Sequence, residues 1–341
     1  MSLLTVVKQA AARFANVIVI VHTVGPILLE KWHDLPSVKG ILFAHLPGQE
    51  AGESLTDILF GRFSPSGHLP YSIPKRENDY PESVSLRGYA LGQVQDTFSE
   101  GLYIDYRYLN KAGIEPRYSF GHGLSYTNFT YSALALAPGV SLSTFPPARR
   151  PKDTASIPTY SNAQPSPNEV AFPPGLKRIN RYLYPYLDNP SQYLTTNKYP
   201  YPAGYSTTPK PDPRAGGGLG GNDALWDIVY TVSLTVTNTG SVAGKEVVQL
   251  YVTYPSSSFD TPLVQLRNFA KTRTLNPGES ENVVLTMTRK DLSVWDTVAQ
   301  DWRVPNLEGS YTFWLGRASD DLRWACESAV GSCSGGRTPP V

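Results

Sequence analysis

The chain has 341 residues, and its 30 lysines and arginines almost balance its 29 aspartates and glutamates. Such a balance gives no strong electrostatic field, so it excludes nucleic acid and anionic membranes as partners held mainly by charge. A hydrophobic content of 40% is enough to build cores, and the length favours two domains. The 30 prolines, 28 glycines and 21 tyrosines favour strands and turns over long helices.

The amino-terminal residues predict a helix followed by a buried strand, not a targeting segment. Residues 3–14 are predicted to form the helix, and the apolar run at residues 16–21 the strand. The segment lacks the basic stretch, long apolar core and cleavage site of a signal peptide. Its run VIVIV is far shorter than the ~20 residues that span a bilayer. A chain that opens within a helix–strand unit is expected to be truncated.

The first 135 residues alternate between strand and helix patterns. Residues 25–32 predict a second helix, and residues 38–46 a second buried strand. Residues 48–61 predict another helix, with Leu55, Ile58 and Leu59 on its inner face. This alternation predicts an α/β domain with a mostly parallel sheet. Two such units make only part of a sheet, so we expect this part of the chain to expose apolar surface and to be poorly stable alone.

The rest of the chain divides into a connector and a β-sandwich. Residues 136–222 are rich in proline, serine and glycine, so we predict a linker or insertion there, with one short helix at residues 174–187. In residues 223–335, short segments of alternating polarity are separated by turn residues. Strands are predicted within residues 227–240, 244–255, 281–289 and 309–316. This pattern predicts an all-β sandwich of the immunoglobulin type.

Two groups of carboxylates are candidates for acid–base chemistry. A glycosidase needs two carboxyls about 5–9.5 Å apart. In a strand, Glu100 and Asp105 would lie roughly 16 Å apart on opposite faces, so they fail as a couple, and Asp105 is expected to pair with Arg107. The predicted helix at residues 48–61 offers a second group, Glu50, Glu53 and Asp57. Acids in the first turn of a helix are stabilised by its dipole, so we interpret this group as structural.

The five histidines form no recognisable catalytic or metal-binding motif. They are His22, His33, His45, His68 and His122. The sequence has neither an HExxH motif nor a GxSxG elbow, and the stretch PRYSFGHGLSYTNFTYS lacks the GxGxxG spacing of a dinucleotide site. We interpret the glycines around His122 as parts of a turn near the end of the α/β domain. No metal and no cofactor are expected.

Two cysteines and one sequon bear on the compartment of the protein. Cys326 and Cys333 are close enough for a small disulfide loop, although two free thiols remain an alternative. The single glycosylation sequon, NFT at Asn128, fits an oxidising and glycosylating route and favours the disulfide.

Four stretches together resemble the C-terminal half of fungal family-3 glycoside hydrolases, the β-glucosidase group. They are residues 16–73, which begin NVIVIVHTVGPILLEKW, residues 98–132, which end RYSFGHGLSYTNFTYS, VSLTVTNTGSVAGKEVVQLYV at residues 232–252, and TRKDLSVWDTVAQDWRVP at residues 288–305. The resemblance implies that residues 1–135 are the last part of the family's α/β sandwich domain. It implies that residues 223–335 are a fibronectin type III-like domain, with a TIM-like barrel preceding both in the full-length protein.

The resemblance also implies a chemistry that this chain does not carry by itself. Family members are retaining hydrolases of terminal β-D-glucosyl residues, as in cellobiose and cello-oligosaccharides, and need no cofactor. No residue here matches the nucleophilic aspartate or the acid/base glutamate, so the isolated chain is expected to be inactive. The resemblance further implies that these residues contact the missing barrel in the full-length protein. It also implies that the full-length protein is a secreted enzyme.

Two functions of other classes remain as alternatives. One is a non-catalytic scaffold or carbohydrate-contacting protein, for which the sandwich offers an analogy of fold alone. The other, a flavodoxin-like nucleotide binder, is disfavoured because no phosphate-cradling glycine loop follows Val21.

Overall fold

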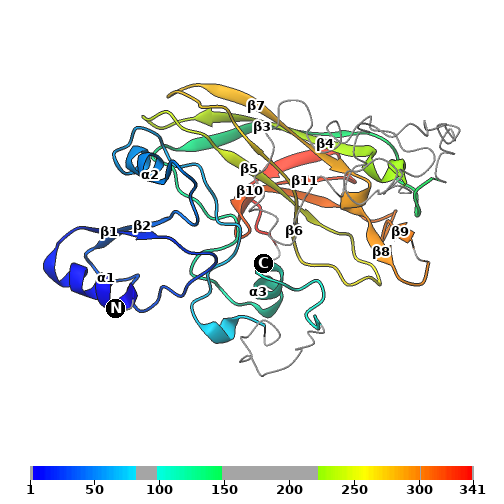
Figure 1. The fold of residues 1–341 in the computed structure, drawn as a ribbon. Coiled ribbons are helices and arrows are strands. Elements are labelled where there is room, and N and C mark those ends of the chain that lie inside the picture. The colour runs from blue at the N-terminus through cyan, green and yellow to red at the C-terminus, as the bar shows by residue number, and fades with distance from the viewer. Residues whose placement is uncertain (1–2, 82–97, 148–221, 300, 340–341) are drawn as a thin grey trace, which may run out of the picture. The chain divides into compact units, whose positions relative to one another are not determined.

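The computed structural model describes residues 3–81, 98–147, 222–299 and 301–339, and Met1–Pro147 and Ala224–Val341 form one compact unit. The first part holds helix α1 (Leu3–Arg13), strands β1 (Val17–Val21) and β2 (Val38–Phe43), and helix α2 (Ala51–Leu59) (Figure 1). Strands β1 and β2 pair in parallel, as the alternating pattern predicts. The predicted helix at residues 174–187 and most of the linker lie outside the described residues.

The predicted helix at residues 25–32 is wrong. Only one turn forms there, in which the carbonyl of Leu29 accepts from the backbone N–H groups of Trp32 (3.0 Å) and His33 (2.9 Å). The hydroxyl of Thr23 donates to the carbonyl of Gly25 at 2.9 Å and accepts from its N–H at 3.4 Å, which closes a turn where the predicted helix would begin. The single turn is enough to bury Leu29 and Trp32.

The hydrophobic core of this first part is small. Its buried members are Val7, Val19, Val21, Leu29, Trp32, Leu69 and Ile73. Helix α2 has no buried residue, and its predicted inner face is half-buried. Val24 is 88% exposed and Phe60 is 84% exposed. The expected exposure of apolar surface is therefore confirmed, whereas the low stability of this part stays a prediction.

No strand joins Glu100 to Asp105, because Glu100 lies in a turn and Asp105 directly precedes helix α3 (Tyr106–Ala112). A short 3-10 helix, η1 (Glu77–Asp79), comes earlier in the chain. Asp105 is the N-cap of α3, and its carboxylate accepts from the N–H of Tyr106 at 2.6 Å and from the hydroxyl of Ser72 at 2.7 Å. The expected pairing of Asp105 with Arg107 is thus wrong, because Asp105 fastens the helix to Ser72 instead.

The second part is the predicted β-sandwich. One sheet has the order β12-β11-β10-β5-β6, the other β3-β4-β7, and β8 and β9 form a separate hairpin. The strands are β3 (Phe129–Pro138), β4 (Ile228–Asn238), β5 (Val247–Thr253), β6 (Gln265–Lys271), β7 (Ser280–Thr288), β8 (Val294–Asp296), β9 (Asp301–Arg303), β10 (Thr312–Ala318), β11 (Asp321–Glu327) and β12 (Ser332–Gly335). Two 3-10 helices, η5 (Asp223–Trp226) and η6 (Lys290–Leu292), precede β4 and β8.

The sandwich starts earlier in the chain than the boundary predicted after residue 135. Strand β3 pairs with β4 from Phe129 opposite Asn238 to Pro138 opposite Tyr230. The predicted boundary therefore falls inside a strand of the sandwich. Arg289, which is almost fully buried, extends this link, because its guanidinium donates to the carbonyls of Ser141 (3.1 Å) and Ser143 (2.9 Å) just after β3.

Strand β5 is buried on both faces. Val248, Leu250 and Val252 point into the core between the two sheets, where β4 contributes Val232, Leu234 and Val236. The opposite face of β5 carries Gln249 and Tyr251, and both are buried by residues from the stretch that contains α3. An antiparallel sheet normally exposes one face to water, so this second burial marks where the first part of the chain packs on the sandwich.

A buried charge lies beside this junction. Glu246 accepts hydrogen bonds from the phenol of Tyr131 and from the guanidinium of Arg317, both at 2.7 Å. Arg317 also donates to the backbone carbonyl of Phe129 at 2.6 Å, so the cluster joins β3 to β10. Removing one partner would leave a charge buried without its counterpart.

A disulfide bond joins Cys326 and Cys333 across the β11–β12 hairpin. Cys326 is fully buried in the sandwich core, so the bond fastens an edge strand to that core.

We predict that Glu246→Ala lowers the free energy of unfolding by about 3–5 kcal/mol, because it strands the guanidinium of Arg317. Urea unfolding followed by far-ultraviolet circular dichroism measures this loss. Glu308→Ala is the matched control, since Glu308 is exposed on the same sandwich, and a change within about 0.5 kcal/mol is expected. Equal effects of the two substitutions would contradict the role of Glu246.

Candidate functional site

The stretch around His122 is a turn that is shaped by close backbone contacts. The N–H of Gly121 donates to the carbonyl of Leu69, and the N–H of Leu69 donates to the carbonyl of His122, both at 2.8 Å. Gly121 has φ of 83°, and a Cβ there would lie 2.2 Å from the side-chain oxygen of Gln249. A Cβ on Gly123 would lie 2.5 Å from the carbonyl of Gly67. Both glycines are therefore required by packing, as the interpretation of this stretch as a turn anticipated.

His122 packs on aromatic rings. Its imidazole stacks on Tyr118 with ring centroids 4.8 Å apart, and His33 meets Tyr118 edge-on at 5.9 Å. Burial lowers the pKa of His122, and the nearby Asp320 opposes this shift. The structure thus brings together two histidines that are distant in sequence, one on each side of the Tyr118 ring, and His33 also has the carboxylate of Asp34 2.5 Å from its Nδ1 atom.

His68 and Gln249 both form hydrogen bonds to the same turn. The Nδ1 atom of His68 lies 2.5 Å from the carbonyl of Gly121, and a carbonyl can only accept, so Nδ1 carries the proton. The amide of Gln249 donates to the same carbonyl at 3.0 Å and to the carbonyl of Arg317 at 2.5 Å. These polar side chains are used to join the turn to the sandwich.

The remaining histidines and helix acids lie apart from this turn. His45 has φ of 51° and meets Tyr71 edge-on at 5.7 Å, while His22 is exposed after β1. On α2, Asp57 pairs with Arg62 at 2.6 Å, and Glu53 approaches the same guanidinium at 4.0 Å. The structural interpretation of these acids agrees with this ion pairing.

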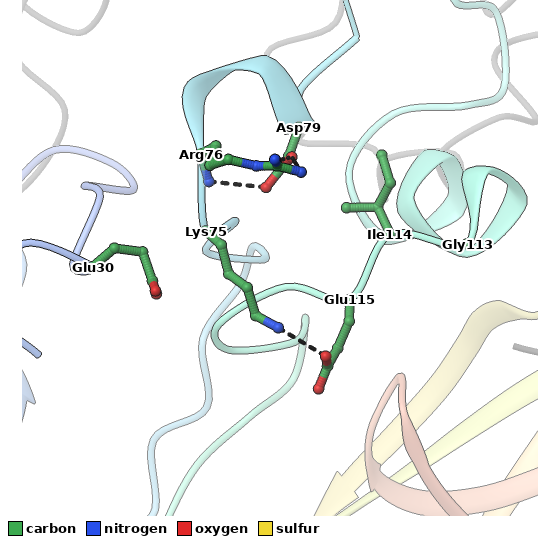
Figure 2. Close-up of a pocket in the computed structure, with 7 residues that line it drawn as sticks. All are labelled: Glu30, Lys75, Arg76, Asp79, Gly113, Ile114 and Glu115. Atoms are coloured by element: carbon green, nitrogen blue, oxygen red, sulfur yellow. Dashed lines mark hydrogen bonds and ion pairs between the residues drawn. The ribbon is translucent and has the colours of Figure 1, made fainter. Parts of the chain in front are cut away.

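A hollow of about 520 Å³ lies between loops of the first part and the end of α3. It is lined by Glu30, Lys75, Arg76, Asp79, Gly113, Ile114 and Glu115. Figure 2 shows Lys75 reaching across to Glu115, and Arg76 folding back onto Asp79. Sequence reasoning missed this group, because its members come from three separate segments and no spacing connects them.

The charged groups of the hollow are neutralised in pairs. Lys75 donates to Glu115 at 2.7 Å, and Arg76 pairs with Asp79 at 3.1 Å. Glu30 accepts two hydrogen bonds, of 2.5 and 2.8 Å, from the guanidinium of Arg117. These bonds lower the pKa of Glu30, and the bond from Lys75 lowers the pKa of Glu115.

Lowered pKa values make these carboxyls unsuited to general-acid work. A glycosidase needs one carboxyl whose pKa is raised, so that it stays protonated until it meets the leaving oxygen. In the part of the chain that the structure describes, the carboxyls with a shifted pKa are Glu30, Glu115, Glu279 and Asp296, and all shift downwards. We therefore interpret the hollow as an ion-paired part of the protein surface.

The described residues contain no group of three histidine, cysteine, aspartate or glutamate side chains placed to hold a metal ion. None of their helices has the length and the apolar character needed to cross a bilayer.

Comparison with known families matches both halves of the fold. Residues 3–126 match the Glycosyl hydrolase family 3 C-terminal domain, and residues 246–319 match the Fibronectin type III-like domain. The chain carries the C-terminal domain of glycosyl hydrolase family 3. The match ends at residue 126, shortly before β3 enters the sandwich, so the family 3 domain and the sandwich follow each other without a break.

Curated relatives and solved structures agree with this assignment. The chain is 58% identical over 330 residues to a probable β-glucosidase F from Aspergillus fumigatus, covering 96% of this chain and 38% of the relative. It is 42% identical over 319 residues to a probable β-glucosidase E from the same fungus, covering 93% of this chain and 30% of the relative. Both relatives are thus much longer than the region they share with this chain.

The fold matches that of solved fungal enzymes. A Chaetomium thermophilum β-glucosidase aligns with a TM-score of 0.69 and 35% identity, covering 95% of this chain and 39% of that one. A β-D-glucoside glucohydrolase from Trichoderma reesei aligns with a TM-score of 0.67 and 35% identity, covering 95% of this chain and 35% of that one.

We predict that Glu30→Gln removes a pH-dependent part of the stability. The pKa of Glu30 is lowered in the folded chain from its ordinary value of 4.5, chiefly by its hydrogen bonds with Arg117. The ion pair therefore stabilises the fold above about pH 4.5, and this stabilisation disappears as the pH falls through the lowered pKa. The melting temperatures of the two proteins should differ near neutral pH and converge as the pH falls from 4.5 through the lowered pKa of Glu30.

The control for this experiment is Glu77→Gln, a change of the same kind at an exposed position of η1. Its melting temperature is expected to follow that of the parent chain across the whole pH range. A constant offset for Glu30→Gln at every pH would contradict the ion-pair explanation.

Proposed function

We propose that this chain is the non-catalytic C-terminal part of a β-glucosidase, and that these 341 residues do not hydrolyse β-glucosides by themselves. The observation that carries the proposal is the use of carboxylates in the described family 3 domain. Asp105 caps α3, Asp79 and Asp57 pair with arginines, and Glu30 and Glu115 are ion-paired. These carboxylates are engaged by arginine and lysine side chains or by hydroxyl and N–H groups of the fold, so they hold structure together.

The length of the relatives also supports a non-catalytic role for this chain. The chain spans 38% of the length of the β-glucosidase F relatives, so most of each relative lies outside the shared region. We propose that the remaining length carries the catalytic carboxyls, and that the substrates of the whole enzyme are β-glucosides such as cello-oligosaccharides.

The exposed apolar side chains of the first part support a packing partner. Val24 follows β1, Leu46 follows β2, and Leu124 lies just beyond the turn at His122. Each is largely exposed, and the contact of such apolar side chains with water is energetically unfavourable. We propose that the rest of the enzyme, including a barrel domain, covers this surface.

The disulfide and the sequon support a secreted glycoprotein. Asn128 is exposed immediately before β3, and its carbonyl is held by the N–H of Thr239 at 2.8 Å, so the backbone is fixed while the side chain faces solvent. Thr130, the third residue of the sequon, is exposed as well. We propose that Asn128 carries an N-linked glycan and that the enzyme acts outside the cell, in the breakdown of cellulose and other β-glucans.

We predict that the purified chain releases no glucose from an aryl β-glucoside above the rate without protein. Removal of catalytic carboxyls costs many orders of magnitude in rate, so any trace of activity should come from a contaminant. A colorimetric assay on the chain and on its Glu115→Gln and Asp105→Asn variants makes this check. Turnover that copurifies with the chain and disappears in one of the variants would contradict the proposal.

We predict that the chain secreted from a yeast host loses mass on treatment with peptide N-glycosidase. Asn128→Gln and Thr130→Ala should both abolish the loss, whereas Thr130→Ser should keep it, because serine also completes the sequon. Intact-mass spectrometry measures the difference. A secreted parent chain whose mass is unchanged by the enzyme would refute glycosylation at Asn128.

A further inference from the structure

An outward-facing pair of tryptophans stands on the hairpin of β8 and β9. Trp295 and Trp302 are directly opposite in the antiparallel register, so both side chains lie on the same face of the hairpin. Their ring centroids are 5.7 Å apart, and Trp295 is 46% exposed. A large aromatic ring held in water on a surface hairpin is an unusual use of tryptophan.

Hydrogen bonds and an ion pair support the hairpin beneath these rings. Asp296 accepts from the N–H groups of Val298 (2.9 Å) and Ala299 (3.0 Å) and pairs with Arg303 at 3.1 Å. The guanidinium of Arg303 in turn lies over the rings of Phe145 (5.6 Å) and Phe259 (5.5 Å). These contacts hold the two strands that carry Trp295 and Trp302.

Lys290 connects the hairpin tryptophans to Trp226 of η5. The ammonium of Lys290 lies 5.0 Å from the ring centroid of Trp226 and 5.4 Å from that of Trp302. These cation–π contacts join three tryptophans from η5, β8 and β9 into one group. Figure 1 shows β8 and β9 next to each other, separate from the two main sheets of the sandwich. We call Trp226, Lys290, Trp295 and Trp302 the tryptophan face.

We propose that the tryptophan face binds a β-glucan chain. The substituents of a β-glucosyl ring are equatorial, so both of its faces present C–H groups that suit the negative face of an indole. The ammonium of Lys290 has N–H groups for sugar hydroxyls. Asp296 is paired with Arg303, and Lys290 and Asp301 carry opposite charges, so these four residues give no net charge that would attract a polyanion. The choice of a β-linked glucan rests on the proposed function.

The test is calorimetric titration of the purified full chain with cellohexaose, which needs no tryptophan signal. Binding is expected for the parent chain and not for maltohexaose, whose α-linked chain coils and does not lie along an extended face. Trp295→Ala should weaken binding about tenfold or more, the size of effect that loss of one aromatic stacking partner produces. Phe269→Ala removes an aromatic ring that is 64% exposed on β6, and should leave the affinity unchanged.

A second variant covers the chance that Trp295→Ala disturbs the hairpin. Trp295→Phe keeps a ring at the same position and should retain more affinity than Trp295→Ala, with a melting temperature like that of the parent. The proposal is overturned by a parent chain that does not bind cellohexaose, by equal binding of maltohexaose, or by an unchanged affinity in both variants. Because the titration measures no hydrolysis, a chain that proved catalytic would refute the proposed function and leave this result standing.

Discussion

The burial of β5 on both faces is the constraint on which the rest of the structure depends. Its inner face completes the sandwich core, and its outer face receives the stretch from α3 to the turn at His122. Tyr251 is fully buried there, against Tyr106 at a ring-centroid distance of 6.0 Å. The hydroxyl of Tyr106 accepts from the N–H of Leu266 on β6 at 3.0 Å. Full burial of one such large side chain contributes about 1.5–3 kcal/mol, and this contact belongs to a cluster separate from the small core around β1 and β2.

This constraint decides the roles of the conspicuous polar residues. Gln249, His68 and Gly121 meet where the first part of the chain reaches β5, and their hydrogen-bonding groups are used there. Asp105 and Ser72 bring α3 into position for the same contact. Polar residues that could be mistaken for catalytic groups in the sequence thus join the two domains. This structural role agrees with the proposal that the catalytic site lies outside this chain.

Much of the fold could be predicted from the sequence, for physical reasons that differ between elements. The strand at residues 16–21 and the alternation of β4 are strong local patterns, and both are observed. The prediction for residues 25–32 rested on their apolar residues and on Pro26, which is tolerated in the first turn of a helix, and it did not include the turn that Thr23 closes. Asp105 and the charged hollow at Lys75 could not be foreseen, because their partners are distant in sequence and depend on tertiary packing. The tryptophan face needed the register of β8 and β9.

We propose that this chain supplies structure to a catalytic part located in the remaining length of its relatives. The most direct measurement mixes the purified chain with the portion of the Aspergillus fumigatus probable β-glucosidase F that this chain does not match, and follows hydrolysis of an aryl β-glucoside. We expect that neither part is active alone and that activity appears on mixing, in proportion to the complex formed. Hydrolysis by this chain alone, unchanged by the added part, would contradict this proposal.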